Sequence, residues 1–178
     1  LNKKFLKFSN KKIDLLRLNM SHVKLQSLDK LIKKIKKTTK VPICIDTEGA
    51  QIRTKVLISK NLRKGQKFYI SKNNGNFKVY PNEVFFKLKL HDIILIGFDN
   101  LAGKIIKIGK NKITLRCTSS GLLEANKGVH VKNRKIKINF LTHKDFKAIE
   151  IAKKNKIKNF ELSFTNNCED IKKFNSLL

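Results

Sequence analysis

Two short apolar runs, each followed at once by polar residues, constrain the fold of this chain most strongly. Residues 13–16 precede a polar cluster at 17–22, and residues 41–45 precede a second cluster at 46–54. The segment between them carries apolar residues at helical spacing, namely Leu28, Leu31, Ile32 and Ile35. Strand, helix and strand form a βαβ unit with parallel strands and a right-handed crossover. Both clusters are therefore expected at the carboxyl edge of one sheet, where α/β enzymes build their sites.

Oxygen-bearing side chains in these two clusters indicate a cation site. They are Asn19, Ser21, Asp46 and Thr47. Amide, hydroxyl and carboxylate oxygens are hard ligands that suit alkali or alkaline-earth ions. The alternative is that these residue types only cap local turns through hydrogen bonds, which is a common role for them.

Two arginines at the same predicted edge, Arg17 and Arg53, indicate an anion site. Arginine binds phosphate bidentately and can neutralise the charge on a phosphoryl group during its transfer. Only five of the 41 basic residues are arginines, so two at one edge favour this interpretation. The alternative is a surface ion pair, which contributes little energy.

The middle of the chain, residues 55–135, predicts an all-β insertion. Short β-type runs are expected at 56–58, 67–70, 77–80, 92–98, 103–108 and 112–117. Turn signals at 64–65, 73–75, 99–100 and 109–111 separate them. Short strands at regular spacing, without a helix-period segment, are typical of a small barrel or sandwich.

The α/β pattern returns after about residue 137. Thr142 with Asp145 three residues later predicts a capping box, and Phe146, Ile149 and Ala152 mark one face of the helix that follows. Residues 159–164 predict another strand. Asn167 is then expected to cap a last helix that carries Glu169 and Asp170 in its first turn.

The composition favours a folded protein with a cationic, solvated surface. The formal charge of +28 is typical of nucleic-acid binding, but the lysines are spread along the chain and the lysine-rich bias fits A/T-rich codons. Cys44, Cys117 and Cys168 lie too far apart for a zinc site and indicate reduced thiols in a cytoplasmic protein. The longest apolar run, at 93–96, is too short to cross a membrane. Because the chain begins with Leu1, we expect the gene product to start earlier.

An ordered series of these motifs resembles the pyruvate kinase family. Residues 17–22, RLNMSH, resemble the family's RLNFSH, and residues 46–54, DTEGAQIRT, resemble its DTKGPEIRT. Residues 92–101 resemble a turn of the family's lid domain, and 121–129 resemble the segment that returns from lid to barrel. Residues 141–145 and 162–164 match two later landmarks, so the resemblance spans nearly the whole chain.

The resemblance implies an α/β fold, in which a partial TIM (β/α) barrel is interrupted by an inserted all-β, barrel-like lid domain. The barrel parts would be residues 1–54 and 137–178, and the lid residues 55–136. Since eight βα units need roughly 250 residues and this chain supplies about three units, we expect a piece of a longer polypeptide, inactive by itself.

The family's activity implies that phosphoenolpyruvate transfers its phosphoryl group to ADP, which gives pyruvate and ATP in glycolysis. By resemblance, potassium is held by Asn19, Ser21, Asp46 and Thr47, while Arg17 contacts the substrate phosphate and Arg53 is catalytic. The residues implied to contact the nucleotide are Asn19, His22, Arg53 and Lys127. Magnesium is also implied, with ligands expected beyond Leu178, and the full-length protein is expected to be a homo-oligomer without a membrane partner.

Several residues depart from the family pattern. Glu48 replaces a lysine, Ala50 replaces a proline, and Gln51 stands where an acid or a lysine tends to track potassium dependence. Residues 165–167 replace basic residues. These departures leave a catalytically inactive relative as an alternative, and a basic nucleic-acid-binding module as a less favoured one.

Overall fold

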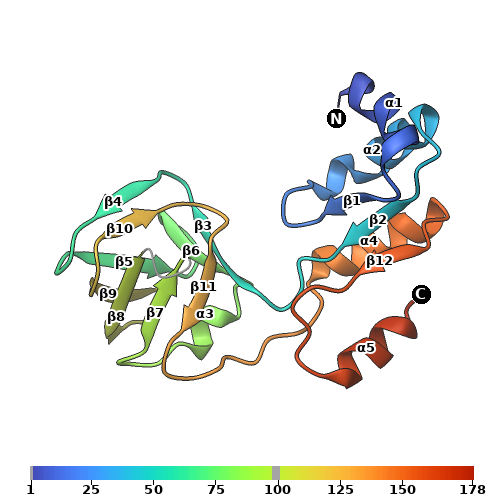
Figure 1. The fold of residues 1–178 in the computed structure, drawn as a ribbon. Coiled ribbons are helices and arrows are strands. Elements are labelled where there is room, and N and C mark those ends of the chain that lie inside the picture. Colours follow the sequence, from blue (N-terminus) through green and yellow to red (C-terminus); the bar gives the residue numbers. More distant parts are fainter. Residues whose placement is uncertain (1, 98–100) are drawn as a thin grey trace. The chain divides into compact units, whose positions relative to one another are not determined.

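The computed structural model of the chain describes residues 2–97 and 101–178 (Figure 1). The turn predicted at 99–100 lies outside these residues. The chain divides into two compact units. The α/β unit comprises Leu1–Ala50 and Asn139–Leu178, and the β unit comprises Gln51–Ile138.

The α/β unit contains a three-stranded parallel sheet with the strand order β1-β2-β12. Its elements are α1 (Lys3–Lys12), β1 (Leu16–Asn19), α2 (Leu25–Thr38), β2 (Ile43–Asp46), α4 (His143–Lys154), β12 (Asn159–Glu161) and α5 (Cys168–Asn175). The helix α2 connects the neighbouring parallel strands β1 and β2, which confirms the predicted βαβ unit.

One face of this sheet forms the core of the α/β unit. Alternate strand residues point to that face, which is why Leu16 and Leu18 of β1 are buried there with Ile43 and Ile45 of β2. They pack in one cluster with the apolar residues Leu28, Ile32 and Ile35 of α2 and Ala148 and Ala152 of α4. Arg17, Asn19 and Asp46 alternate with these buried residues and therefore lie on the opposite face of the sheet. The residues that the sequence predicts for a cation and anion site are thus on the side away from this core.

The bounds of all three strands in this unit differ from the predicted ones. The first strand begins at Leu16, three residues later than expected, because Ile13 ends α1 with its backbone N–H bonded to the carbonyl of Ser9. The second strand is Ile43–Asp46 and not 41–45, and the third stops at Glu161. Phe146 is also 43% exposed, because the buried face of α4 runs through Ala148, Ile149 and Ala152.

The two helix caps predicted from sequence are confirmed. Thr142 and Asp145 form a reciprocal capping box at the start of α4. Asn167 accepts a hydrogen bond from the backbone of Asp170 at the start of α5, and Glu169 lies in the same first turn.

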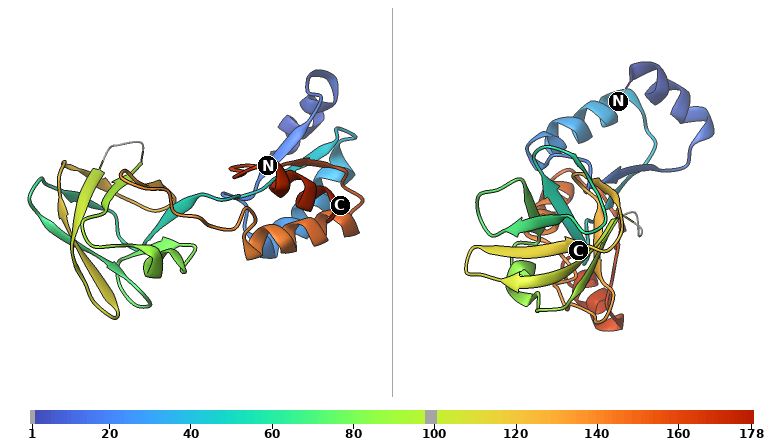
Figure 2. Two further views of the ribbon diagram at one scale, coloured as in Figure 1. Left: turned by 90° about the horizontal axis from the view of Figure 1, so that it is seen from below. Right: turned by 90° about the vertical axis from the view of Figure 1, so that its left-hand side faces the viewer.

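The β unit is built on a seven-stranded antiparallel sheet that curls into a nearly closed barrel (Figures 1 and 2). In spatial order its strands are β5 (Lys67–Ser71), β9 (Lys112–Cys117), β8 (Leu101–Ile108), β7 (Ile93–Ile96), β11 (Gly128–Val131), β3 (Ile52–Val56) and β6 (Phe77–Tyr80). The rings of Phe68 on β5 and Phe77 on β6 stack with centroids 6.2 Å apart, so the two end strands lie close together. The predicted fold class, α/β with an inserted barrel-like β domain, is therefore confirmed.

Some elements of the β unit were missed. A separate antiparallel pair joins β4 (Lys60–Leu62) to β10 (Gly121–Leu123), a short helix α3 covers Val84–Lys87, and β11 was not predicted. The strand expected at 56–58 is wrong beyond Val56, because Leu57 and Ile58 are 78% and 75% exposed. Neither offers the half-buried surface on which strand pairing depends.

The three cysteines differ in burial. Cys44 and Cys117 are buried and Cys168 is exposed, and all three are free. Burial raises the pKa of the Cys44 and Cys117 thiols. Among the described residues, every helix is too short or too polar to cross a membrane.

An ion pair inside the β unit makes its stability depend on pH. Asp92 is 1% exposed, and its carboxylate accepts bonds from Arg134 at 2.7 and 2.9 Å and from the backbone of Lys89 at 2.8 Å. Burial alone would raise the pKa of Asp92, but the bonds from Arg134 and Lys89 outweigh it and hold the pKa below its ordinary value.

We expect Asp92→Asn to reduce the free energy of unfolding by about 1–3 kcal/mol near neutral pH. A lowered native pKa stabilises the fold above the unfolded value of about 3.9, and this contribution is lost as the pH falls through the native pKa. Urea unfolding of parent and variant at pH 6 and pH 3 should therefore give a smaller difference at pH 3. An equal difference at both values would contradict the prediction.

Candidate functional site

The last residues of the three parallel strands form one row across the sheet. Asn19 of β1 is the register partner of Asp46 of β2, and Asp46 is the partner of Glu161 of β12. Ser21 and Thr47 follow within two residues of the strand ends. Because parallel strands end at one edge, the structure brings Asn19 and Asp46 together as predicted, and it adds Glu161, which the sequence did not single out. We call this row with its flanking residues the strand-end cluster.

Asp46 is the buried anchor of the strand-end cluster. Its side chain is 1% exposed, and each of its carboxylate oxygens has a partner. Oδ2 accepts from Nη2 of Arg17 at 2.5 Å, and Oδ1 accepts from the hydroxyl of Ser163 at 2.6 Å. A buried polar group requires such partners, and these two bonds hold the Asp46 side chain in a fixed position. Ser163 was part of a predicted landmark but not of the predicted site.

Arg17 contacts two carboxylates at once. Besides Asp46, its Nε lies 2.8 Å from Oε2 of Glu161, and the side chains of Arg17 and Glu161 are each about half exposed, at 50% and 49%. The guanidinium is therefore at the predicted edge, but it is engaged in ion pairs within the chain. The sequence allowed two roles for Arg17, a ligand of an anion or a partner in an ion pair. Both roles use the same guanidinium.

The remaining predicted cation ligands also make hydrogen bonds within the chain. Oδ1 of Asn19 accepts from the backbone N–H of Ser21 at 2.8 Å. Thr47 accepts at its hydroxyl from the backbone of Ser163 at 3.0 Å, and it donates its own backbone N–H to the carbonyl of Glu161 at 3.0 Å. His22 is exposed beside them. These bonds fix the turns that hold the oxygens near one another.

A second network lies next to the cluster and involves Glu48. This residue is 8% exposed, and its carboxylate pairs with Nζ of Lys144 at 3.0 Å and accepts from the hydroxyl of Thr142 at 3.1 Å. Lys144 also donates to the carbonyl of Met20. The negative charge by which Glu48 departs from the family pattern is thus neutralised by a neighbouring lysine. The capping motif at 142–145 was the sequence signal that could have identified Lys144.

Asp145 fixes the turn that contains Glu48. It is fully buried, and its carboxylate accepts the backbone N–H groups of Glu48 at 2.7 Å and Gly49 at 3.2 Å. Burial raises the pKa of Asp145, and the hydrogen bonds from Thr142, Glu48 and Gly49 oppose that effect.

Arg53 and Lys127 belong to the β unit, where they are neighbours. Arg53 on β3 is the register partner of Gly128, and the backbone N–H of Lys127 donates to the hydroxyl of Thr54 at 2.9 Å. Arg53 is held loosely: its Nη1 lies 3.5 Å from the carbonyl of Asn126, and its buried Nε has no hydrogen-bond partner among the described residues. Nζ of Lys127 pairs with Glu124 at 3.1 Å.

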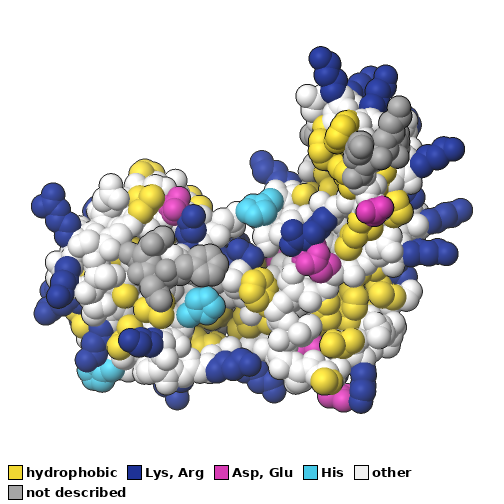
Figure 3. All heavy atoms as spheres, viewed as in Figure 1, with side chains coloured by type: hydrophobic (Ala, Val, Ile, Leu, Met, Phe, Trp, Pro, Cys, Tyr) yellow, Lys and Arg dark blue, Asp and Glu magenta, His cyan; other side chains and the backbone are white. Residues whose placement is uncertain are grey.

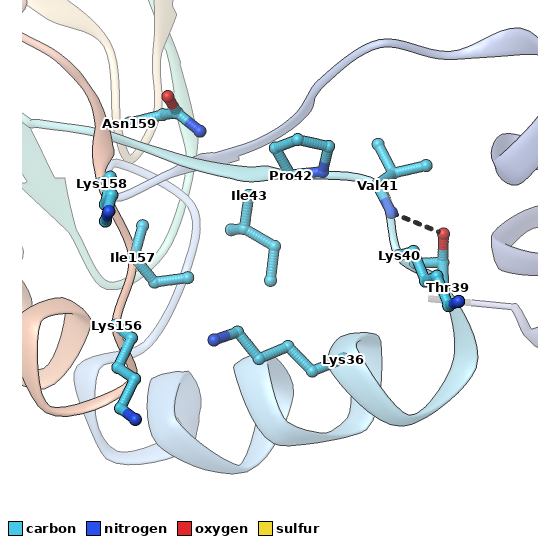
Figure 4. Close-up of a pocket in the computed structure, with 10 residues that line it drawn as sticks. All are labelled: Lys36, Thr39, Lys40, Val41, Pro42, Ile43, Lys156, Ile157, Lys158 and Asn159. Carbon is cyan, nitrogen blue, oxygen red and sulfur yellow. Dashed lines mark hydrogen bonds between the residues drawn. The ribbon is translucent and has the colours of Figure 1, made fainter.

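A cavity of about 460 Å³ lies at the opposite ends of β2 and β12 (Figure 4). Ile43 and Ile157 point into it, and its lining includes Lys36, Lys156 and Lys158. It contains none of the predicted site residues. Lysine and arginine side chains are otherwise scattered over the face shown in Figure 3. Within the described residues, no three His, Cys, Asp or Glu side chains gather as a metal cluster.

The comparisons of this chain with known proteins agree on one family. The family described as "Pyruvate kinase, barrel domain" matches residues 2–178. The pyruvate kinase of Buchnera aphidicola subsp. Schizaphis graminum is 28% identical over 183 residues, which cover 93% of this chain and 37% of that protein. The pyruvate kinase of Aeropyrum pernix is 21% identical over 171 residues, with the same two coverages. That of Thermococcus litoralis is 25% identical over 174 residues. The chain thus spans about 37% of the length of these relatives.

Proposed function

This chain belongs to the pyruvate kinase barrel-domain family, and we propose that it supplies part of a site that transfers a phosphoryl group from phosphoenolpyruvate to ADP. The observation that carries the proposal is the strand-end cluster, in which Asn19 and Asp46 share one row with Arg17 bonded to Asp46. A fixed carboxylate, neighbouring neutral oxygens and a guanidinium are the groups that a cation and a phosphate need at one place.

We propose that Asn19, Ser21, Asp46 and Thr47 hold potassium. One buried carboxylate among neutral oxygens suits a monovalent cation, because hard oxygen ligands with a low total charge match its own low charge. The bound ion would offset negative charge on the substrate phosphate. Magnesium, by resemblance, would be held by residues beyond Leu178.

The proposed reaction breaks the bond between phosphorus and the enol oxygen of phosphoenolpyruvate and forms a bond from phosphorus to an ADP oxygen. The enolate that leaves takes up a proton at carbon and becomes pyruvate. Arg17 would hold the substrate phosphate, and Arg53 would stabilise charge on the phosphoryl group in transfer. The loose attachment of Arg53 supports this role, since within residues 2–97 and 101–178 its guanidinium pairs with no carboxylate.

By the same resemblance, Asn19, His22, Arg53 and Lys127 would contact the nucleotide. His22 is exposed, and in the part of the chain that the structure describes the Arg53 side chain makes one hydrogen bond, a long one. The full-length protein would be a cytoplasmic homo-oligomer.

The test is a coupled assay of pyruvate formation on the full-length gene product, with phosphoenolpyruvate, ADP, magnesium and potassium. Arg53→Ala should lower kcat by about 100- to 1000-fold, the usual effect of removing one group that stabilises transition-state charge. Arg63→Ala is the matched control, because Arg63 is an exposed arginine of the same unit. Absence of turnover in the unmodified protein, with both metals present, would contradict the enzymatic proposal.

A second candidate is a relative that binds phosphoenolpyruvate without turning it over. The departure at Glu48 favours it, because the turn beside the strand-end cluster carries a carboxylate where the family pattern has a lysine. Isothermal titration with phosphoenolpyruvate separates the two functions: binding without pyruvate formation supports this candidate, and turnover excludes it.

A further inference from the structure

The guanidinium of Arg17 has one of its two hydrogen-bonding edges fully engaged. Nε and Nη2 form that edge, and each bonds a different carboxylate, Glu161 at 2.8 Å and Asp46 at 2.5 Å. A phosphate that binds arginine bidentately needs two N–H groups of one edge. An incoming phosphate must therefore use the other edge of Arg17 or displace a carboxylate.

The two carboxylates differ in how readily they can be displaced. Asp46 is buried, and its second oxygen is bonded by Ser163 at 2.6 Å. Glu161 is the last residue of β12, and its side chain is 49% exposed. Its backbone carbonyl accepts from Thr47, so the backbone stays in place whatever the side chain does. Glu161 is the partner that can leave.

We propose that Glu161 competes with the substrate phosphate for Arg17 and so weakens phosphate binding at this site. The inference rests on the proposed role of Arg17 as a phosphate ligand. Glu161 is the register neighbour of Asp46, so its carboxylate remains near the bound phosphate even after it is displaced. Two effects then act in the same direction: loss of the ion pair and repulsion between like charges.

The decisive variant is Glu161→Gln, which keeps the size of the side chain and removes its charge. We expect the Kd for phosphoenolpyruvate, measured by isothermal titration at constant potassium chloride, to fall by about 3- to 30-fold. Inorganic phosphate should show a gain in the same direction. A purely structural role of Glu161 predicts the opposite sign, because damage to a site does not tighten binding.

Two controls isolate the effect. Glu169→Gln makes the same chemical change at an exposed glutamate of α5, which pairs with Lys172 at 2.8 Å, and should leave the Kd unchanged. The double variant Lys156→Ala/Lys158→Ala alters the lysine-lined cavity at the other end of the strands and should not change the gain. On an Arg17→Ala background the gain should shrink to the part that comes from charge repulsion, since the competition itself acts through the contact between Arg17 and Glu161.

The inference is overturned if Glu161→Gln binds both anions no more tightly than the parent, if neither protein binds them, or if the gain is undiminished without Arg17. Its failure can be distinguished from failure of the proposed function. Tighter binding in Glu161→Gln without any pyruvate formation would contradict the proposed enzymatic activity and support the competition by Glu161. Pyruvate formation together with an unchanged Kd in Glu161→Gln would support the activity and contradict the competition.

Discussion

Gly49→Ala should destabilise the α/β unit by about 3–5 kcal/mol, one of the two largest effects we expect from a single substitution. Gly49 has φ of +66°, where a side chain costs about 1–2 kcal/mol. A Cβ at this position would also lie 1.9 Å from the carbonyl oxygen of Ser163 and 2.6 Å from its carbon. Because both atoms are backbone of the segment that carries the Asp46 partner Ser163, relief of the clash requires that segment to move.

The measurement is urea unfolding followed by circular dichroism. Gly65→Ala is the matched control, because Gly65 also has a positive φ, +85°, but has no atom within 4 Å of an added Cβ. It should therefore show only the backbone cost, about 1–2 kcal/mol. If Gly49→Ala lost no more stability than Gly65→Ala, the close approach of Ser163 would not constrain the fold.

The role of Gly49 could not be predicted from the sequence, whereas the unit around it could. The helical spacing of Leu28, Ile32 and Ile35 predicts α2, and all three residues are buried. Local patterns of this kind suffice because burial of one helix face needs no knowledge of distant residues. The approach of Ser163 to Gly49 joins residues 114 positions apart in sequence, and no local pattern encodes it.

The strand-end cluster shows the same division between local and distant information. The meeting of Asn19 and Asp46 followed from strand direction alone, since parallel strands end at one edge. Glu161 was missed because its place in the row depends on the register of β12 against β2. The exact start of β1 was missed for a related reason: Leu15 reads as apolar but is 44% exposed, and only pairing with β2 selects Leu16.

In the β unit, strands whose residues clearly alternate between the two faces of the sheet were predicted. Strands that form only through pairing with residues distant in the sequence were not. The run 112–117 alternates exposed and buried residues as expected. The strand β4, by contrast, has the sequence Lys-Asn-Leu, and it pairs with β10 some 60 residues later. A sequence this polar acquires strand structure only from its partner.

Asp145→Ala should destabilise the α/β unit by about 3–5 kcal/mol, because it removes more than a helix cap. The capping box alone is worth about 1–2 kcal/mol. The carboxylate also accepts the backbone N–H groups of Glu48 and Gly49, and without it these buried donors lose their partner at about 1–3 kcal/mol each. The turn at residues 48–49 should therefore loosen together with the start of α4.

Asp170→Ala is the matched control, since Asp170 occupies the same position in the first turn of α5 and its carboxylate accepts a local bond from the backbone of Asn166 at 2.8 Å. It should cost about 1 kcal/mol. Hydrogen exchange of the Glu48 and Gly49 amides gives a second readout. Asp145→Ala should speed their exchange relative to Asp170→Ala, because an amide that has lost its buried acceptor opens more readily. Equal losses of stability in the two variants, with the two amides equally protected, would mean that Asp145 acts as an ordinary cap and that the turn beside the strand-end cluster is held by other contacts.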